Sequence, residues 1–198
     1  MEKLETIFYT TIIGIIVVFG AGMYMTGSAS HAPAQNSATS ANSYNITLVI
    51  TTGNYFTSAN HNQPAYYVLE NGQLTSSAQI YLPSSTLIHL TIINYDSGPG
   101  NVPSTYANVM GTTNGTEFIM NDSAVNMSSG SEGQWVTTVP SMNLNILVPS
   151  QSITEATFHT GNSGSFQWQC EVDCGTGTNG WGGAMETPGW MMGQVIVQ

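Results

Sequence analysis

The chain has 198 residues, and only 6% of them are Asp, Glu, Lys or Arg, where about 25% is typical of globular domains. Its formal charge of -10 comes from 11 carboxylates against a single basic side chain, Lys3. Because neutralising phosphates requires Lys or Arg, this composition excludes nucleic acid as a partner.

The polar surface must instead consist mainly of Ser, Thr, Asn, Gln and Gly. Such a surface has almost no salt bridges to lose when carboxylates become protonated, so it suits an acidic medium. The composition therefore favours an acidophile, and we expect an archaeal one. A glycosylated surface protein is a compatible alternative, because N-glycosylation sequons occur at Asn45, Asn114, Asn121 and Asn126.

Residues 1–26 are predicted to form a transmembrane anchor. The run from Leu4 to Met25 carries one charge, Glu5, and a bilayer-spanning helix needs about 20 apolar residues. A cleaved signal peptide would have a more basic start and a shorter apolar stretch, so a retained anchor is favoured. Lys3 favours a cytoplasmic N-terminus. We therefore expect a single-pass protein of the cell membrane with an extracytoplasmic C-terminal domain.

Residues 27–43 are small and polar without a hydrophobic period, which is typical of a flexible linker. His31 in this segment has no second ligand nearby and is interpreted as a solvated linker residue. The remaining residues, 44–198, are long enough for one globular domain.

This domain shows short runs rich in β-branched and aromatic residues, separated by Gly, Pro, Asn and Ser, which predict an all-β fold. The predicted strands are Tyr44–Thr52, Ala65–Glu70, Ala78–Leu82, Thr86–Asn94, Met142–Val148, Ile153–His159, Ser165–Cys170 and Met191–Val197, with weaker signals at Glu117–Met120 and Trp135–Val139. The interval 100–138 is otherwise interpreted as a large surface excursion.

Alternation gives two of these strands a buried face. Apolar residues alternate with Asn from Met142 to Ile146, and with Gln from Phe166 to Cys170. Cys170 is therefore expected to point toward the core. Its spacing from Cys174 permits a disulfide, a redox dithiol or two thiolates on one metal ion.

The surroundings of the two cysteines are more specific. The segment Phe166-Gln-Trp-Gln-Cys-Glu-Val-Asp-Cys-Gly-Thr-Gly177, followed by Met191-Met-Gly-Gln-Val-Ile-Val197, resembles subunit II of the haem-copper oxidases in its single-anchor form. Asn143–Pro149 and Gly164–Trp168 extend the resemblance upstream. The chain is also similar to blue copper proteins, including the membrane-bound sulfocyanins. This resemblance implies a cupredoxin-like Greek-key β-sandwich.

Both imidazole ligands that the resemblance calls for are replaced, by Gly100 and Thr178. Of the family's binuclear copper ligands there remain Cys170, Cys174, the Val172 carbonyl and Met191, and about ten extra residues precede that Met. The resemblance therefore implies a cupredoxin without its usual copper.

A rebuilt copper site remains open, because two thiolates with Met185, Met191 or Met192 suit Cu(I). Recruitment of a histidine is disfavoured: His89 and His159 are interpreted as hydrogen-bonded structural residues and His61 as a solvated one. A Cys170–Cys174 disulfide is favoured over bound metal, because an unmetallated pair oxidises readily outside the cytoplasm.

The leading hypothesis is a non-catalytic, copper-free subunit II-like component of a terminal quinol oxidase in a respiratory chain. Its partners would be the haem-bearing subunit and other membrane respiratory subunits. The alternatives are a membrane-anchored cupredoxin electron carrier with a thiolate and Met copper site, and a glycosylated surface protein. No catalytic residues are predicted, and Glu171 and Asp173 are interpreted as solvent-facing.

Overall fold

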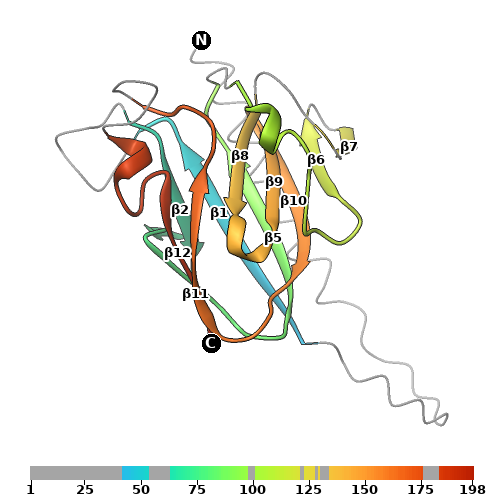
Figure 1. Cartoon of the computed structure of the whole chain (residues 1–198). Coiled ribbons are helices and arrows are strands. Elements are labelled where there is room, and N and C mark those ends of the chain that lie inside the picture. Colours follow the sequence, from blue (N-terminus) through green and yellow to red (C-terminus); the bar gives the residue numbers. More distant parts are fainter. Residues whose placement is uncertain are drawn as a thin grey trace, which may run out of the picture. The chain divides into compact units, whose positions relative to one another are not determined.

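The computed structural model describes residues 42–53, 63–97, 101–120, 123–127, 129, 134–175 and 183–198. They form two β-sheets packed face to face, which confirms the predicted all-β class for this part of the chain (Figure 1). None of the helices among the described residues is long and apolar enough to cross a membrane. The predicted anchor and all but the end of the predicted linker lie outside these residues.

The larger sheet has seven strands in the order β3-β2-β1-β5-β10-β6-β7. Their bounds are β3 Gln73–Ser76, β2 Ala65–Glu70, β1 Ser43–Thr51, β5 Leu87–Asn94, β10 Ser152–His159, β6 Thr116–Met120 and β7 Ser123–Met127. β1 and β5 run parallel, and the other neighbours run antiparallel.

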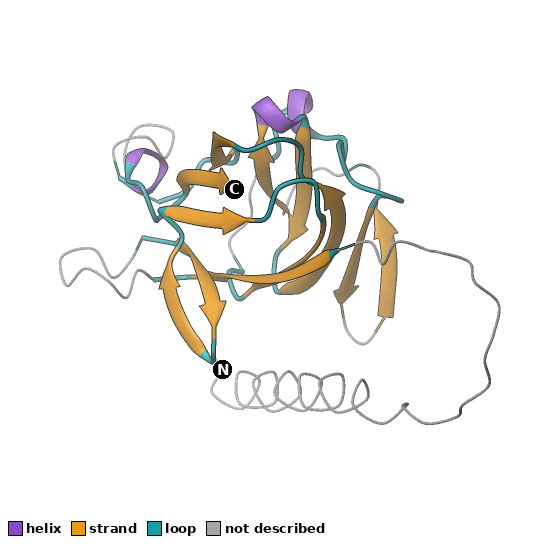
Figure 2. Ribbon diagram, turned by 90° about the horizontal axis from the view of Figure 1, so that it is seen from below, coloured by secondary structure: helices purple, strands orange, loops and turns teal. Residues whose placement is uncertain are grey.

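The smaller sheet has five strands in the order β4-β12-β11-β8-β9. Their bounds are β4 Gln79–Leu82, β12 Met192–Val197, β11 Gly164–Cys170, β8 Gln134–Val139 and β9 Leu144–Pro149. Short 3-10 helices, drawn in purple in Figure 2, interrupt the connections at η1 (Ser104–Tyr106), η2 (Pro140–Met142) and η3 (Ala184–Glu186).

The eight clearly predicted strands are confirmed, with ends shifted by one or two residues. Two strands were not predicted: β3, because QLTS has only one apolar residue, and β7, because the apolar residues of SAVNM do not alternate with polar ones. The interpretation of residues 100–138 as a surface excursion is wrong. This interval supplies β6 and β7 to one sheet and β8 to the other.

The alternation expected from Met142 to Ile146 is also wrong. Met142 belongs to η2, and Asn143 takes the left-handed conformation with φ 53°, so the strand begins at Leu144, two residues later than predicted. All six residues of β9 are buried. Asn145 is buried because its Nδ2 donates to the carbonyls of Tyr106, at 2.8 Å, and Asn108, at 2.5 Å, which satisfies its amide donors.

The alternation predicted for β11 is confirmed. Trp168 and Cys170 are 1% and 0% exposed, whereas Gln167, the residue before Trp168, is exposed. Two contacts fix the Trp168 side chain inside the core. Its indole Nε1 donates to the Ser77 carbonyl at 3.1 Å, and its ring meets the Tyr66 ring edge-on with centroids 5.1 Å apart.

Tyr66 joins the two sheets directly. It lies on β2 of the larger sheet, and its hydroxyl is 2.7 Å from Thr137 Oγ1 on β8 of the smaller sheet. The Tyr66 carbonyl also accepts from Ser77 Oγ at 2.8 Å. The polar ends of two large aromatic side chains are therefore satisfied inside the core, which removes the penalty for burying them.

Gly193 permits this arrangement, because a Cβ there would meet Trp168 Nε1 at 2.6 Å and the carbonyls of Ser77 and Ala78 at 2.7 and 2.8 Å. We predict that Gly193→Ala destabilises the domain by about 1–3 kcal/mol through overpacking. The measurement is equilibrium unfolding in urea. Gly161→Ala is the matched control, since its Cβ would meet nothing within 4 Å. Equal stability of the two variants would contradict the prediction.

The outer face of the larger sheet places two exposed carboxylates opposite each other, Glu155 on β10 and Glu117 on β6. Like charges directly opposite on neighbouring strands are destabilising by about 0.2–1 kcal/mol. We predict that Glu155→Gln raises the free energy of unfolding at pH 7 by that amount, and that most of this gain disappears in about 1 M salt, which screens exposed charges. Unfolding curves at low and high salt test this, and an equal gain at both would contradict it.

Candidate functional site

The two cysteines form a buried thiol pair at the end of β11. Cys170 is the last residue of the strand, and Cys174 follows after a turn of three residues. Both are free thiols, 0% and 3% exposed, and their Sγ atoms lie 3.5 Å apart. A disulfide has an S–S distance of about 2.05 Å, so the structure brings the predicted partners together in the dithiol form. The predicted disulfide stays a prediction.

One backbone carbonyl serves both thiols. The Val172 oxygen accepts from Cys174 Sγ at 2.9 Å and lies 3.7 Å from Cys170 Sγ. The Val172 side chain is 2% exposed and anchors the middle of the turn in the core. The turn therefore directs both S–H groups inward, toward a carbonyl in its own backbone.

Two further segments hold this turn in place. The Cys170 amide donates to the Met191 carbonyl at 2.8 Å, and the Met191 amide donates to the Ala184 carbonyl at 3.1 Å. Gly175, at φ +83°, closes the turn against Ala184 and the buried side chain of Gln63. A Cβ at Gly175 would collide with Gln63 Oε1, so this close approach requires glycine.

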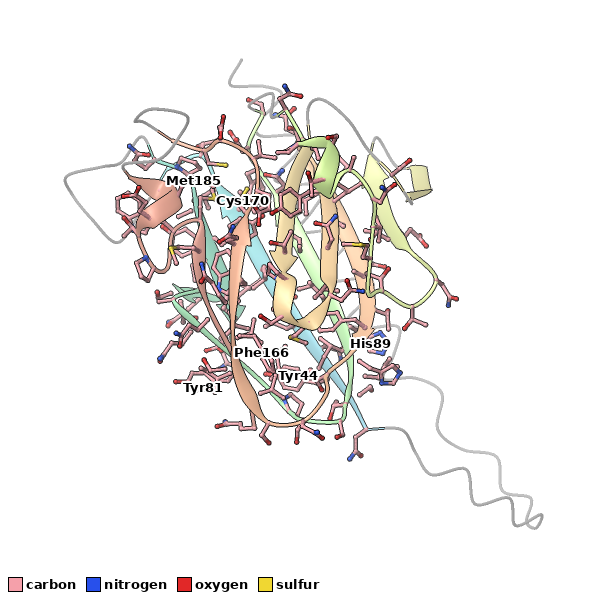
Figure 3. All side chains as sticks on the ribbon, viewed as in Figure 1. Tyr44, Tyr81, His89, Phe166, Cys170 and Met185 are labelled. Carbon is pink, nitrogen blue, oxygen red and sulfur yellow. The ribbon has the colours of Figure 1, made fainter. Side chains whose placement is uncertain are left out.

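The thioether side chains predicted as alternative ligands lie in the same region. Met191 and Met185 are 0% and 3% exposed, and Met185 belongs to η3. Figure 3 shows Cys170 and Met185 toward the same end of the sandwich. Met192, by contrast, begins β12, pairs with Gln169 and is partly exposed.

The surroundings favour the protonated thiol. The hydrogen bond with Cys170 raises the pKa of Cys174 far above its usual range, and burial and the negative charges of Asp96 and Asp173 add to this. Burial also raises the pKa of Tyr66 well above its usual value, and the neighbouring Cys170 sulfur contributes in the same direction. A metal ion would have to displace these protons, because only the thiolate is a ligand.

Glu171 was expected to face the solvent, and this expectation is only partly met. It is half-buried, and its Oε1 accepts from Gln169 Nε2 at 2.7 Å and from Thr138 Oγ1 at 3.0 Å. Tyr106 is the last residue of η1. Burial raises its pKa, and the charge of Glu171 and the hydrogen bond with Glu171 raise it further. Glu171 therefore ties the cysteine turn to β8 and to η1. Asp173 is exposed, as predicted.

The described histidines lie away from the thiol pair. His89 is exposed on β5, with Nδ1 3.4 Å from Thr157 Oγ1, and His159 is exposed at the last position of β10. Figure 3 shows His89 toward the end of the sandwich opposite Cys170. Among the described residues, no group of three or more His, Cys, Asp or Glu could hold a metal ion. His31 and His61 lie outside the described residues.

The binuclear copper centre implied by the resemblance does not fit these residues. The two thiols, the Val172 carbonyl and Met191 are assembled, but Gly100 and Thr178 replace the imidazoles in the sequence. Neither described histidine supplies a replacement, because His89 lies toward the opposite end of the sandwich in Figure 3 and His159 pairs with Leu87, two residues before His89 on β5. Gly100 and Thr178 themselves lie outside the described residues. A site with sulfur and carbonyl donors alone lacks the nitrogen ligands of that centre.

The predicted sequons are only partly described. Asn45 is exposed on β1, and Asn114 is exposed in a turn at φ 66°. Asn126 belongs to β7, and Asn121 lies outside the described residues. Carriage of a glycan at these positions stays a prediction.

The sequence did not single out Tyr66, Thr137, Asp96 or Tyr106. All four reach the site through contacts between residues more than 30 positions apart, which single-strand patterns do not encode. Asp96 could have been found, because it lies in the Ile93–Pro99 stretch where the resemblance expects a ligand loop.

No protein-family model matches the chain, and no curated protein matches it either. Among solved structures, the chain is similar to a haem-copper terminal oxidase dimer, with 12% identity, a TM-score of 0.39 and coverage of 99% of this chain and 95% of that one. It is similar to rusticyanin from Thiobacillus ferrooxidans, with 13% identity, a TM-score of 0.35 and coverage of 79% and 78%. It is similar to auracyanin B, with 11% identity, a TM-score of 0.35 and coverage of 87% and 95%.

The raised pKa of Cys174 predicts how stability depends on pH. The unfolded thiol titrates near pH 8.5 and the folded one only at a higher pH, so this contribution is complete below about pH 8.5 and is lost as the pH rises beyond it. We predict that the free energy of unfolding falls by about 1.4 kcal/mol per pH unit for this thiol, and that Cys174→Ser flattens the slope between pH 8.5 and 10. An unchanged slope in urea titrations would contradict the assignment.

Proposed function

We propose that this chain is a copper-free, cupredoxin-like subunit II component of a membrane terminal oxidase that takes its electrons from quinol. The observation that carries the proposal is the thiol pair: at the positions where the resemblance places two copper thiolates, Cys170 and Cys174 are free, buried cysteines that share the Val172 carbonyl. Subunit II with copper collects single electrons from a soluble donor. A quinol-fed oxidase does not need that step.

The protein's role would then be structural. The predicted anchor, residues 1–26, would pass beside the haem-bearing subunit, and the sandwich would cover that subunit outside the membrane. The scarcity of charge is compatible with an acidic exterior, since beyond Lys3 the chain has no Lys or Arg side chain whose ion pairs acid could break.

The experiment is purification of the full chain from its native membrane under mild detergent. We predict that it co-purifies with a haem-containing membrane subunit and with quinol oxidase activity, in a fixed ratio to haem. A chain that purifies reproducibly without any haem protein would contradict the proposal. Removing the gene should lower the amount of assembled haem subunit, while a truncated chain keeping only the anchor would show whether the sandwich is required.

A second function, a membrane-anchored electron carrier, is favoured by one observation. Four sulfur-bearing side chains, Cys170, Cys174, Met185 and Met191, are all at most 3% exposed near one end of the sandwich. Soft sulfur ligands suit Cu(I). The carrier would show one tightly held copper per chain with sulfur-to-copper absorption bands after oxidation. The oxidase subunit would show neither.

A further inference from the structure

We propose that Cys170 and Cys174 form a reversible dithiol–disulfide couple. The couple exchanges with low-molecular-weight disulfides only when the turn from Cys170 to Gly175 opens locally. The inference goes beyond the oxidase role and does not depend on it. It also differs from a permanent disulfide staple, because both redox states would be stable folded states.

Proximity is the first argument. The Sγ atoms are 3.5 Å apart, and a bond requires them to approach to about 2.05 Å. Both residues belong to one short turn, so rotation of the two side chains, with a small adjustment of the turn, closes the gap. No movement of β11 is required, because its last residue remains tied to the Met191 carbonyl.

The second argument is that the reduced form is itself well satisfied. The Val172 carbonyl accepts from the Cys174 thiol at 2.9 Å, and the Cys170 thiol has both this carbonyl and the other sulfur within reach. Forming the disulfide removes both S–H donors and leaves a buried carbonyl without them, which carries a free-energy cost. This cost brings the two redox states closer in free energy than in an ordinary structural disulfide, so the bond should be readily reduced.

Access is the third argument. Cys170 and Cys174 are 0% and 3% exposed, so a reagent disulfide cannot reach either sulfur in the closed structure. Gly175 holds the turn closed by fitting against Gln63 and Ala184, with no room for a Cβ. Exchange must therefore follow a local opening, and its rate should report the stability of this contact.

The reaction is a two-step exchange. One thiol of the pair loses its proton and attacks a sulfur of the reagent disulfide, forming a mixed disulfide and releasing one reagent thiol. The second thiol of the pair then attacks its neighbour's sulfur in the mixed disulfide, closing the Cys170–Cys174 bond and releasing the second reagent thiol. The protein gives up two electrons and two protons, and one reagent disulfide becomes two thiols.

The test uses the full chain in detergent, equilibrated in mixtures of reduced and oxidised glutathione. The mixtures are quenched with acid, and the free thiols are alkylated and counted by intact mass. We expect the native chain to interconvert completely in both directions as the glutathione ratio changes. Cys170→Ser and Cys174→Ser should each stop at a mixed disulfide with one glutathione.

The gating is tested with a pair of glycine variants. We expect Gly175→Ala to accelerate exchange at least tenfold, because its Cβ displaces the Gln63 and Ala184 contacts, and Gly161→Ala to leave the rate unchanged. Should Gly175→Ala fail to fold, urea below the unfolding transition should accelerate exchange in the unmodified chain. Near-ultraviolet circular dichroism should differ between the two redox states, since Tyr66 and Trp168 lie beside the pair, while the far-ultraviolet spectrum stays constant.

Three outcomes would overturn the inference. The pair could hold one redox state at every glutathione ratio until the whole chain unfolds, which would define a permanent staple or an inert dithiol. Exchange could proceed at equal rates in Gly175→Ala, Gly161→Ala and the unmodified chain, with no response to urea. The thiols could also be blocked by a metal ion that a chelator removes.

Discussion

The buried face of β11 is the constraint on which both the fold and the site depend. Its alternation sends Trp168 and Cys170 into the core at successive inward positions. Trp168 is fixed by its bond to the Ser77 carbonyl and by the edge of Tyr66, and this fixes the path of the strand up to the first cysteine. The packing of the sandwich therefore positions the thiol pair at the end of the strand.

The same packing determines the chemistry of the pair. Inside the core the thiols meet a carbonyl, each other and aromatic rings, and the nearest charges are carboxylates. No described residue of the site is a Lys or Arg, since Lys3 is the only such residue in the chain. Such surroundings favour neutral S–H groups. Copper binding would require both thiols to lose their protons, and the charge of the metal ion itself would have to offset the two thiolates.

Much of the sandwich could be predicted because its inward residues follow each strand with period two. Burial alternates along β10, β12 and most of β5, and their runs of β-branched and aromatic residues marked them as strands. The failures share a different cause. β3 pairs with β2 and β7 pairs with β6, and Asn145 is buried because loop carbonyls accept its amide hydrogens. These are non-local contacts, which a strand's own sequence does not record.

The candidate site was predictable to the same depth. The spacing and alternation identified the cysteines, and the family resemblance added the Val172 carbonyl and Met191. The groups that surround the thiols come from distant parts of the chain and were not foreseen: Tyr66 lies about a hundred residues upstream, and Asp96, just after β5, raises the pKa of Cys174. The sequence thus identified the two sulfur atoms, while their distant neighbours and their shared carbonyl became visible only in the structure.

Native mass spectrometry of the full chain, exposed to excess copper and then to a chelator, tests most directly whether this end of the sandwich holds a thiol pair in place of copper. We predict the mass of the metal-free chain, with both cysteines either as thiols or as a disulfide. Retention of one or two copper ions per chain, lost together with the Cys170→Ser substitution, would contradict it.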